Sequence, residues 1–320
     1  MEIYRSIAEA HGNLPNSAVA IGNFDGVHLG HRRLLDTAKA LARAAGSKAA
    51  LLTFEPHPAS VLSPHFAPAR IASVPRKLQL LEEAGLDAVV LQPFDKAYAG
   101  STAEDFVGRD LVQGLQAADV VVGHDFTFGK GRSGNVAMLA ALAGEAARVH
   151  TVPAVTVDGL VVSSSKIREF VLEGRVSQAW RLLGRPFLLD GTVVPGRGRG
   201  RTIGIPTANV APDTELQPAS GVYAVVAAVE GLPGVIGGAA NVGVKPTFGT
   251  EERTVEVHLF DVSADIYGRR VAVGFLERLR GEHRFAGPAE LVAQIHKDIE
   301  AARSIVERQG ALRFGPVPAP

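Results

Sequence analysis

The strongest constraint on the fold of this chain is an abrupt change in the pattern of its elements at Arg185-Pro186. Before this point, short β-branched runs alternate with segments of helical periodicity, and this pattern predicts a parallel, doubly wound sheet. After it, predicted strands follow one another across Gly and Pro turns, which favours an antiparallel barrel or sandwich. We therefore predict a Rossmann-like α/β domain over residues 1–184 and an antiparallel β-barrel domain with a C-terminal helix over residues 185–320.

The individual elements follow from short local patterns. In the first part we expect strands at 17–22, 49–54, 87–91, 119–123 and 149–157. Ser101 and Glu104 have the spacing of a capping box and predict the start of a helix. In the second part we expect strands at 187–194, 222–229, 235–242, 254–260 and 270–276, and one long helix that begins at Gly287-Pro288.

Length, composition and charge narrow the class of protein. A chain of 320 residues with a hydrophobic fraction of 46% is large enough for two cores. Its 33 Lys and Arg balance its 33 Asp and Glu, which argues against a nucleic-acid or anionic-membrane partner. The absence of Cys excludes disulfides, Cys-ligated zinc and a thiol nucleophile. No apolar run has signal-peptide or bilayer-spanning length, so we expect a cytoplasmic protein.

The segment 20–31, AIGNFDGVHLGH, lies between the first predicted strand and the first predicted helix. Ligands bind at this end of a strand in open α/β sheets, and the following helix offers free N–H groups to a phosphate. Gly22, Gly26 and Gly30 allow a nucleotide to approach the backbone, while His28 and His31 can donate to phosphate oxygens. Two histidines three residues apart are also typical of exposed polar positions or half a metal site. The glycines and the location favour phosphate chemistry, and no G-x-G-x-x-G dinucleotide fingerprint occurs here.

These residues carry a family resemblance. GNFDGVHLGH (22–31) resembles the adenylyltransferase signature of the bacterial bifunctional riboflavin kinase/FAD synthetases, and LLTFEPHP (51–58), VVGHDFTFGKGRSG (121–134) and SSSKIR (163–168) match further blocks in order. The resemblance implies transfer of AMP from ATP to FMN with release of pyrophosphate. It implies that His28 and His31 act on the ATP phosphates. The other nucleotide-binding residues that it implies are Gly22, Phe24, Gly30, Ser164, Ser165 and Arg168.

The same resemblance implies a flavin site in the first domain, formed by Pro56, Pro58, Asp125 and Phe128. A planar apolar ligand needs such a pocket with a few polar contacts. Two structural alternatives remain, one for the flavin site and one for the phosphate site. A Phe in an apolar run is usually a core residue, and Ser163 to Ser165 are suited to capping the next helix.

The second domain has its own signature, because GTVVPGRGRGRTIGIPTAN (191–209) resembles the riboflavin kinase motif. Thr207 and Asn209 point to the same face of a strand and offer the oxygen atoms that Mg²⁺ prefers. Gly196 and Gly198 belong to a loop whose backbone amides can close over phosphates. An Arg/Gly nucleic-acid tract is the disfavoured alternative. No Walker A motif is present, so phosphorylation must use another phosphate cradle.

Glu256 matches the catalytic Glu of the family, and a carboxylate is a suitable general base for a ribityl hydroxyl. Its neighbours Val255 and Val257 face the other side of the strand, and an ordinary exposed Glu would show the same pattern. FLERLRGEHRF (275–285) is another matched block, in which Arg280 and Phe285 are candidate flavin contacts. NVGVKPTF (241–248) also matches, with no role assigned to its residues.

Together these observations predict a bifunctional enzyme. The C-terminal domain phosphorylates riboflavin with MgATP, and the N-terminal domain adenylylates the resulting FMN to FAD, so the partners are riboflavin, FMN and the co-substrate ATP, with Mg²⁺ as cofactor. Two alternatives remain. A nucleotidylyltransferase for another acceptor would leave the second signature without a purpose. A catalytically silent flavin or nucleotide sensor is disfavoured, because the predicted site residues of both domains are all present. The sequence does not determine the oligomeric state.

Overall fold

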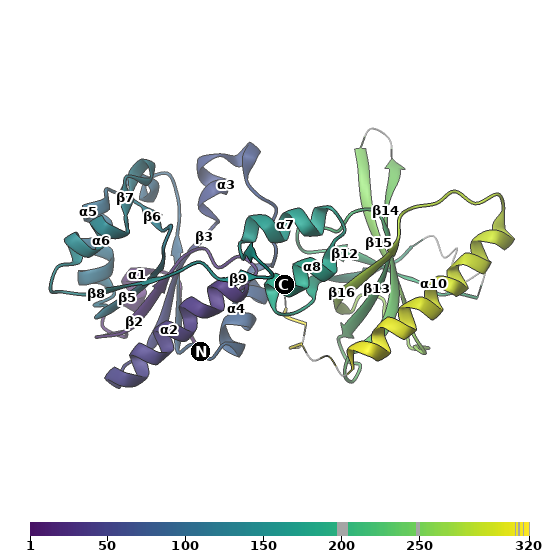
Figure 1. Ribbon diagram of the computed structural model, residues 1–320, viewed down its shortest axis with the longest axis horizontal. Coiled ribbons are helices and arrows are strands. Elements are labelled where there is room, and N and C mark those ends of the chain that lie inside the picture. The colour runs from purple at the N-terminus through teal and green to yellow at the C-terminus, as the bar shows by residue number, and fades with distance from the viewer. Residues whose placement is uncertain (197–203, 248–249, 311, 313, 316, 320) are drawn as a thin grey trace. The chain divides into compact units, whose positions relative to one another are not determined.

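The computed structural model describes residues 1–196, 204–247, 250–310, 312, 314–315 and 317–319 (Figure 1). The chain divides into two compact units, of which the first comprises 1–68 and 77–162 and the second comprises 69–76 and 163–320. Helices α7 (Ser164–Leu172) and α8 (Val176–Leu183) therefore group with the second unit by their packing. A functional boundary near Gly184 stays a prediction.

The first unit is built on a parallel sheet with the strand order β1-β4-β3-β2-β5-β8. Its strands are β1 Glu2–Tyr4, β2 Ala18–Ile21, β3 Ala49–Glu55, β4 Ala88–Pro93, β5 Asp119–Gly123 and β8 Arg148–Val152. From β2 the chain adds β3 and β4 on one side, then crosses to place β5 and β8 on the other. The predicted doubly wound sheet is confirmed, and its topological switch point lies between β2 and β5.

Helices cover both faces of this sheet, as Figure 1 shows. They are α1 Ile7–Ala10, α2 Leu29–Ala45, α3 Pro58–Leu62, α4 Val74–Glu83, α5 Ala103–Asp105, a π-helix at Phe106–Gly114 and α6 Val136–Ala143. Alternate residues of each strand enter different cores: Val19 and Ile21 pack with α1, the π-helix and α6, whereas Ala18 and Ala20 pack with α2 and α4. Two short hairpins, β6 Thr127–Phe128 with β7 Gly134–Asn135 and β9 Thr156–Val157 with β10 Leu160–Val161, project from the loops.

Two local predictions need correction. The capping box is formed by Thr102 and Asp105, one residue after the predicted pair: the Thr102 hydroxyl accepts from the Asp105 N–H at 3.1 Å, and the Asp105 carboxylate accepts from the Thr102 N–H at 3.2 Å. This register buries Ala103 and Phe106 in the core. The predicted strand 149–157 ends at Val152, because Pro153 has no N–H with which to continue the ladder.

The second unit contains a closed antiparallel barrel with the order β11-β12-β15-β14-β13-β16. Its strands are β11 Phe187–Val194, β12 Ala208–Pro212, β13 Gly221–Val229, β14 Ile236–Thr247, β15 Thr250–Leu259 and β16 Arg270–Arg280. Helix α10 (Pro288–Gln309) lies along the outside of the barrel, where Ala302 and Ile305 pack on Ala224 and Val226 (Figure 1). The predicted barrel with a C-terminal helix is confirmed.

Candidate active sites

In the first unit, the loop from β2 to α2 places two imidazoles at the switch point. His28 is the N-cap of α2, and its Nδ1 accepts the backbone N–H of His31 at 3.2 Å. The neutral ring of His28 therefore carries its proton on Nε2. The His28 and His31 rings are stacked, with centroids 3.5 Å apart and planes inclined by 12°.

The glycine and phenylalanine residues of this loop support the histidine pair. A Cβ on Gly30 would lie 3.1 Å from Cε1 of His28, so only Gly leaves the ring its place. The Phe24 ring stacks on the other side of His31 at 4.5 Å, and a Cβ on Gly22 would press on Phe24 at 3.1 Å. The predicted residues Gly22, Phe24, His28, Gly30 and His31 thus form one packed group.

The backbone of the same loop is strained. Phe24 and Val27 have positive φ angles of 51° and 40°, which L-residues and above all β-branched ones rarely adopt. Both side chains are 0% exposed, so burial in the core below α2 maintains the strained turn. Strain of this kind concentrates at functional sites.

The predicted flavin residues of the first unit lie at the carboxyl ends of the strands next to β2. Pro56 follows β3, and Pro58 is the first residue of α3. Asp125 follows β5 with its side chain 84% exposed. Phe128 is 7% exposed, stacks on Phe126 at 5.5 Å and belongs to the apolar core of this face. Pro56 and Asp125 thus lie at one edge of the sheet, whereas the Phe128 ring lies in the core.

An aromatic cluster at this edge was not found from the sequence. Phe54, Phe94 and Tyr98 contact one another with ring centroids 5.8–6.0 Å apart at the ends of β3 and β4. The Tyr98 hydroxyl donates to Asp110 at 2.8 Å, and burial together with that carboxylate raises the pKa of Tyr98. A cavity of about 730 Å³ opens beside Tyr98 and Asp110. Only the pairing of β3 with β4 brings these rings together, so no local sequence pattern indicates them.

Helix α7, which groups with the second unit, carries the residues predicted to bind ATP phosphates in adenylyl transfer. Ser163 caps the helix by accepting the Lys166 N–H at 3.2 Å, so the capping interpretation holds for Ser163. Ser164 and Ser165 lie in the first turn. Arg168 donates through Nε to the carbonyl oxygen of Ala69 at 2.7 Å.

In the barrel, Glu256 lies in a row of polar residues on three neighbouring strands. It pairs with Asn209 on β12 and with Asn241 on β14. Directly opposed residues point to the same face, with Cβ atoms about 4.5–5.5 Å apart. Val255 and Val257 are 1% and 2% exposed inside the barrel, so Glu256 lies on the outer face as its pattern predicts. Asn241 is an addition to the predicted residues.

Of the two predicted magnesium ligands, Asn209 belongs to this row and Thr207 lies two residues before it. Thr207 directly precedes β12, and Asn209 is its second residue. A Cβ on Gly196 would lie 1.9 Å from Nδ2 of Asn209, so the side-chain amide lies against the start of the Gly/Arg loop. Gly198 lies outside the described residues. A hydroxyl and an amide oxygen fit Mg²⁺, which takes few protein ligands beside phosphates. The described residues contain no cluster of three His, Cys, Asp or Glu suited to a metal.

Arg280 has a partner that the sequence did not predict. Its guanidinium forms a bidentate pair with Asp298 of α10, with Nε–Oδ1 and Nη2–Oδ2 distances of 3.1 and 2.8 Å. Asp298 is 6% exposed, so the pair fixes α10 to the end of β16. The same guanidinium lies 5.6 Å from the Phe285 ring centroid.

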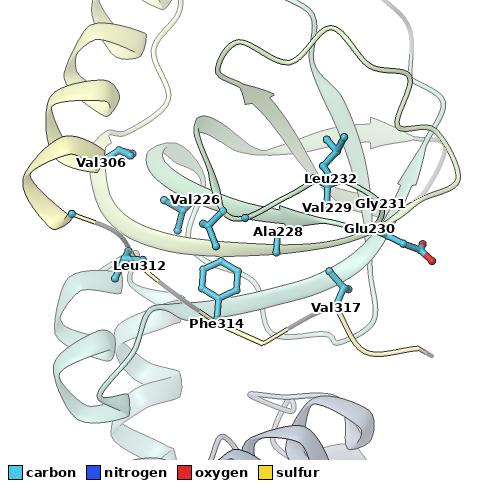
Figure 2. Close-up of a pocket in the computed structure, with 13 residues that line it drawn as sticks. Val226, Ala228, Val229, Glu230, Gly231, Leu232, Val306, Leu312, Phe314 and Val317 are labelled. Carbon is cyan, nitrogen blue, oxygen red and sulfur yellow. The ribbon is translucent and has the colours of Figure 1, made fainter.

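The barrel also has an apolar cavity of about 720 Å³, drawn in Figure 2. Val226, Val229 and Leu232 line one side, and Leu312 and Phe314 of the C-terminal tail line the other. It lies at the β13–β14 turn, whereas Asn241 pairs with Val222 at the opposite end of that hairpin. None of the predicted site residues lines it.

Comparison with known proteins identifies the family. The family model described as FAD synthetase matches residues 11–166, and that described as riboflavin kinase matches residues 183–306. The bifunctional riboflavin kinase/FMN adenylyltransferase of Escherichia coli (strain K12) is 39% identical over 289 residues, which cover 89% of this chain and 91% of that protein. This chain belongs to the bifunctional riboflavin kinase/FMN adenylyltransferase family. The member from Bacillus subtilis (strain 168) is 37% identical over 291 residues, with the same coverage.

The matches confirm the family, the order of the two modules and the two predicted activities, riboflavin kinase and FMN adenylyltransferase. A crystal structure described as a macrolide-efflux protein from Streptococcus pneumoniae has a TM-score of 0.84 at 32% identity and covers 94% of this chain and 98% of that one. Within the described parts of this chain, no helix has both the length and the apolar character needed to cross a membrane.

Proposed function

We propose that the two reactions are performed at the two sites described above, adenylyl transfer at His28 and His31 and phosphoryl transfer at Glu256. The assignment of adenylyl transfer is supported by the stacked imidazole pair at the topological switch point of the sheet. The assignment of phosphoryl transfer is supported by the Glu256 carboxylate, which lies between two amides on the outer face of the barrel.

For adenylyl transfer, a phosphate oxygen of FMN forms a bond to the α-phosphorus of ATP, and the bond to pyrophosphate breaks. The attacking oxygen is already anionic, so orientation and charge neutralisation matter more than a general base. His28 and His31 donate to phosphate oxygens next to the N-terminus of α2, whose dipole adds positive potential. Pro56, Pro58, Asp125 and Phe128 form the flavin side in this proposal, and the assignment of Ser164, Ser165 and Arg168 to the ATP phosphates stays a prediction.

For phosphoryl transfer, the 5′-hydroxyl oxygen of riboflavin forms a bond to the γ-phosphorus, and the bond to ADP breaks. Glu256 receives the hydroxyl proton as general base. Thr207 and Asn209 hold Mg²⁺, which when bound neutralises charge on the ATP phosphates. Gly196 approaches the phosphates through its backbone, and the same role for Gly198, which lies outside the described residues, stays a prediction. Arg280 and Phe285 lie on the flavin side in this proposal. The proposal includes a cytoplasmic location for both reactions.

The test separates the two activities with single substitutions. Glu256→Gln removes the base, so FMN formation from riboflavin should fall roughly 10²–10⁴-fold, while conversion of supplied FMN to FAD continues. His28→Ala should lower FAD formation roughly 10²–10³-fold and leave FMN formation intact. Glu277→Gln and His296→Ala, at exposed positions on β16 and α10, serve as matched controls. Loss of both reactions in either folded single variant contradicts the division.

A further inference from the structure

The row of polar residues around Glu256 has two distinguishable sides. On one side the Asn209 amide lies against Gly196, whose backbone is proposed to bind ATP phosphates. On the other side Asn241 pairs in register with Glu256 on the neighbouring strand, away from Gly196. In phosphoryl transfer the attacking and leaving oxygens lie on opposite sides of the transferred phosphorus, so the donor nucleotide and the acceptor approach from different directions. The geometry therefore separates a nucleotide side from an acceptor side.

Asn241 is well suited to the acceptor side. Its side chain is exposed, while its neighbours Ala240 and Val242 are 0% exposed inside the barrel. Gly243, two residues along the same face, is buried: a Cβ there would lie 3.1 Å from Oε1 of Glu282 and 3.6 Å from Nδ2 of Asn241, so both polar side chains lie close over the backbone at this position. The exposed amide of Asn241, next to the base, is accessible to a flexible polar substrate chain.

We propose that Asn241 binds the ribityl 4′-hydroxyl of riboflavin and so positions the adjacent 5′-hydroxyl at Glu256. This inference rests on the proposed role of Glu256. A primary amide both donates and accepts hydrogen bonds, as does a secondary hydroxyl. Two hydroxyls on adjacent carbons match two side chains that project side by side from paired strands. Asn241 thereby selects an acceptor with a polyol chain.

The test combines Asn241→Ala with 4′-deoxyriboflavin, which lacks the proposed partner hydroxyl. Asn241→Ala should lower the kinase kcat/KM for riboflavin roughly 5-fold to 100-fold, the range for an unpaired hydrogen-bonding group. The KM for MgATP and the conversion of supplied FMN to FAD should not change. The wild-type enzyme should lose a similar factor with 4′-deoxyriboflavin, and the variant should lose little more, because the two changes remove the same contact.

Asn209→Ala is the matched control on the nucleotide side. It should raise the KM for MgATP and retain the full preference for riboflavin over 4′-deoxyriboflavin. Asn241→Ser is measured as a second variant, and thermal unfolding shows whether each variant is folded. Equal losses for the two flavins in Asn241→Ala, or unchanged riboflavin kinetics, would overturn the proposal. Failure of the Glu256 assignment is detected separately, because Glu256→Gln would then retain kinase activity.

Discussion

At the scale of single residues, the structure shows which neighbours lie beside the predicted residue of each candidate site. His28 was assigned to phosphate chemistry from its motif, and the structure adds that it also caps α2 and stacks on His31. Glu256 was assigned from a family match, and strand register adds Asn241 beside it. Motif spacing thus predicts candidate reactive residues, whereas a neighbour such as Asn241 comes from another segment of the chain.

Asp119 at the start of β5 gives a prediction for the pH dependence of stability. The carboxylate is 1% exposed, accepts two hydrogen bonds from Arg148 at 2.9 Å and lies 2.6 Å from Nε2 of His150. Hydrogen bonds from Arg148, followed by the contact with His150, lower the pKa of Asp119 below its usual 3.8. A lowered pKa stabilises the fold above the unfolded-state value, and this contribution is lost as pH falls through the folded-state value.

Urea unfolding between pH 7 and pH 3 measures this contribution. The wild-type chain should lose more stability on acidification than Asp119→Asn, which has no carboxylate to titrate. Asp36→Asn, at an exposed position of α2, is the control and should follow the wild type. Parallel pH profiles for the wild type and Asp119→Asn would contradict this explanation.

At the scale of elements, the sequence predicts periodic segments well and their ends less well. The strand–helix alternation indicates β2, β3, β4 and β5, because their apolar runs are long and buried. Strand β1 is three residues long with an exposed pattern, so it carries no such signal. Ser101/Glu104 and Thr102/Asp105 both satisfy the capping pattern, and core packing of Phe106 decides between them. The aromatic cluster of Phe54, Phe94 and Tyr98 requires the sheet register and cannot be predicted locally.

Replacement of glycine by alanine is expected to affect stability at one position of the second unit and MgATP binding at another. A Cβ on Gly191 would lie 2.3 Å from the backbone oxygen of Ala211, which cannot move without distorting β12. Gly191→Ala should therefore cost about 1–3 kcal/mol of unfolding free energy. A Cβ on Gly196 would meet the movable amide of Asn209. Gly196→Ala should change stability by less than about 0.5 kcal/mol but raise the KM for MgATP roughly tenfold or more by displacing Asn209.

Thermal unfolding and steady-state kinetics of the two variants test this contrast. A stable Gly191→Ala variant would show that the strand pair accommodates a methyl group. Unchanged MgATP kinetics in Gly196→Ala would remove the support for Asn209 on the nucleotide side.

At the scale of the whole molecule, the division into an α/β unit and a barrel was predictable because the two halves differ in periodicity. The grouping of residues 69–76 was not predictable. In the sequence they lie between the two parts of the first unit, 1–68 and 77–162, yet they pack in the second unit. Arg76 explains this grouping: its guanidinium, 1% exposed, pairs with Asp190 of β11 at 2.9 Å for Nε–Oδ2 and 2.5 Å for Nη2–Oδ1. No sequence spacing relates two residues that are 114 positions apart.

Removal of one partner of this buried pair should destabilise the second unit. Arg76→Ala leaves the Asp190 carboxylate buried without its guanidinium, at a cost of about 3–5 kcal/mol. The double variant Arg76→Met/Asp190→Leu removes both charges and should be considerably more stable than Arg76→Ala. The single Trp of the chain, Trp180, packs in the core of the second unit, so its fluorescence during denaturant unfolding reports this effect. Equal stability of the wild type and Arg76→Ala would contradict a structural role for the pair.

One chain is expected to perform both reactions in sequence. The most direct measurement incubates the purified protein with riboflavin, ATP and Mg²⁺ and follows flavins and nucleotides over time by chromatography. FMN should appear first with one ADP for each molecule formed, and FAD should follow with one pyrophosphate. Riboflavin that remains unchanged, or FMN that accumulates without any FAD, would contradict the account.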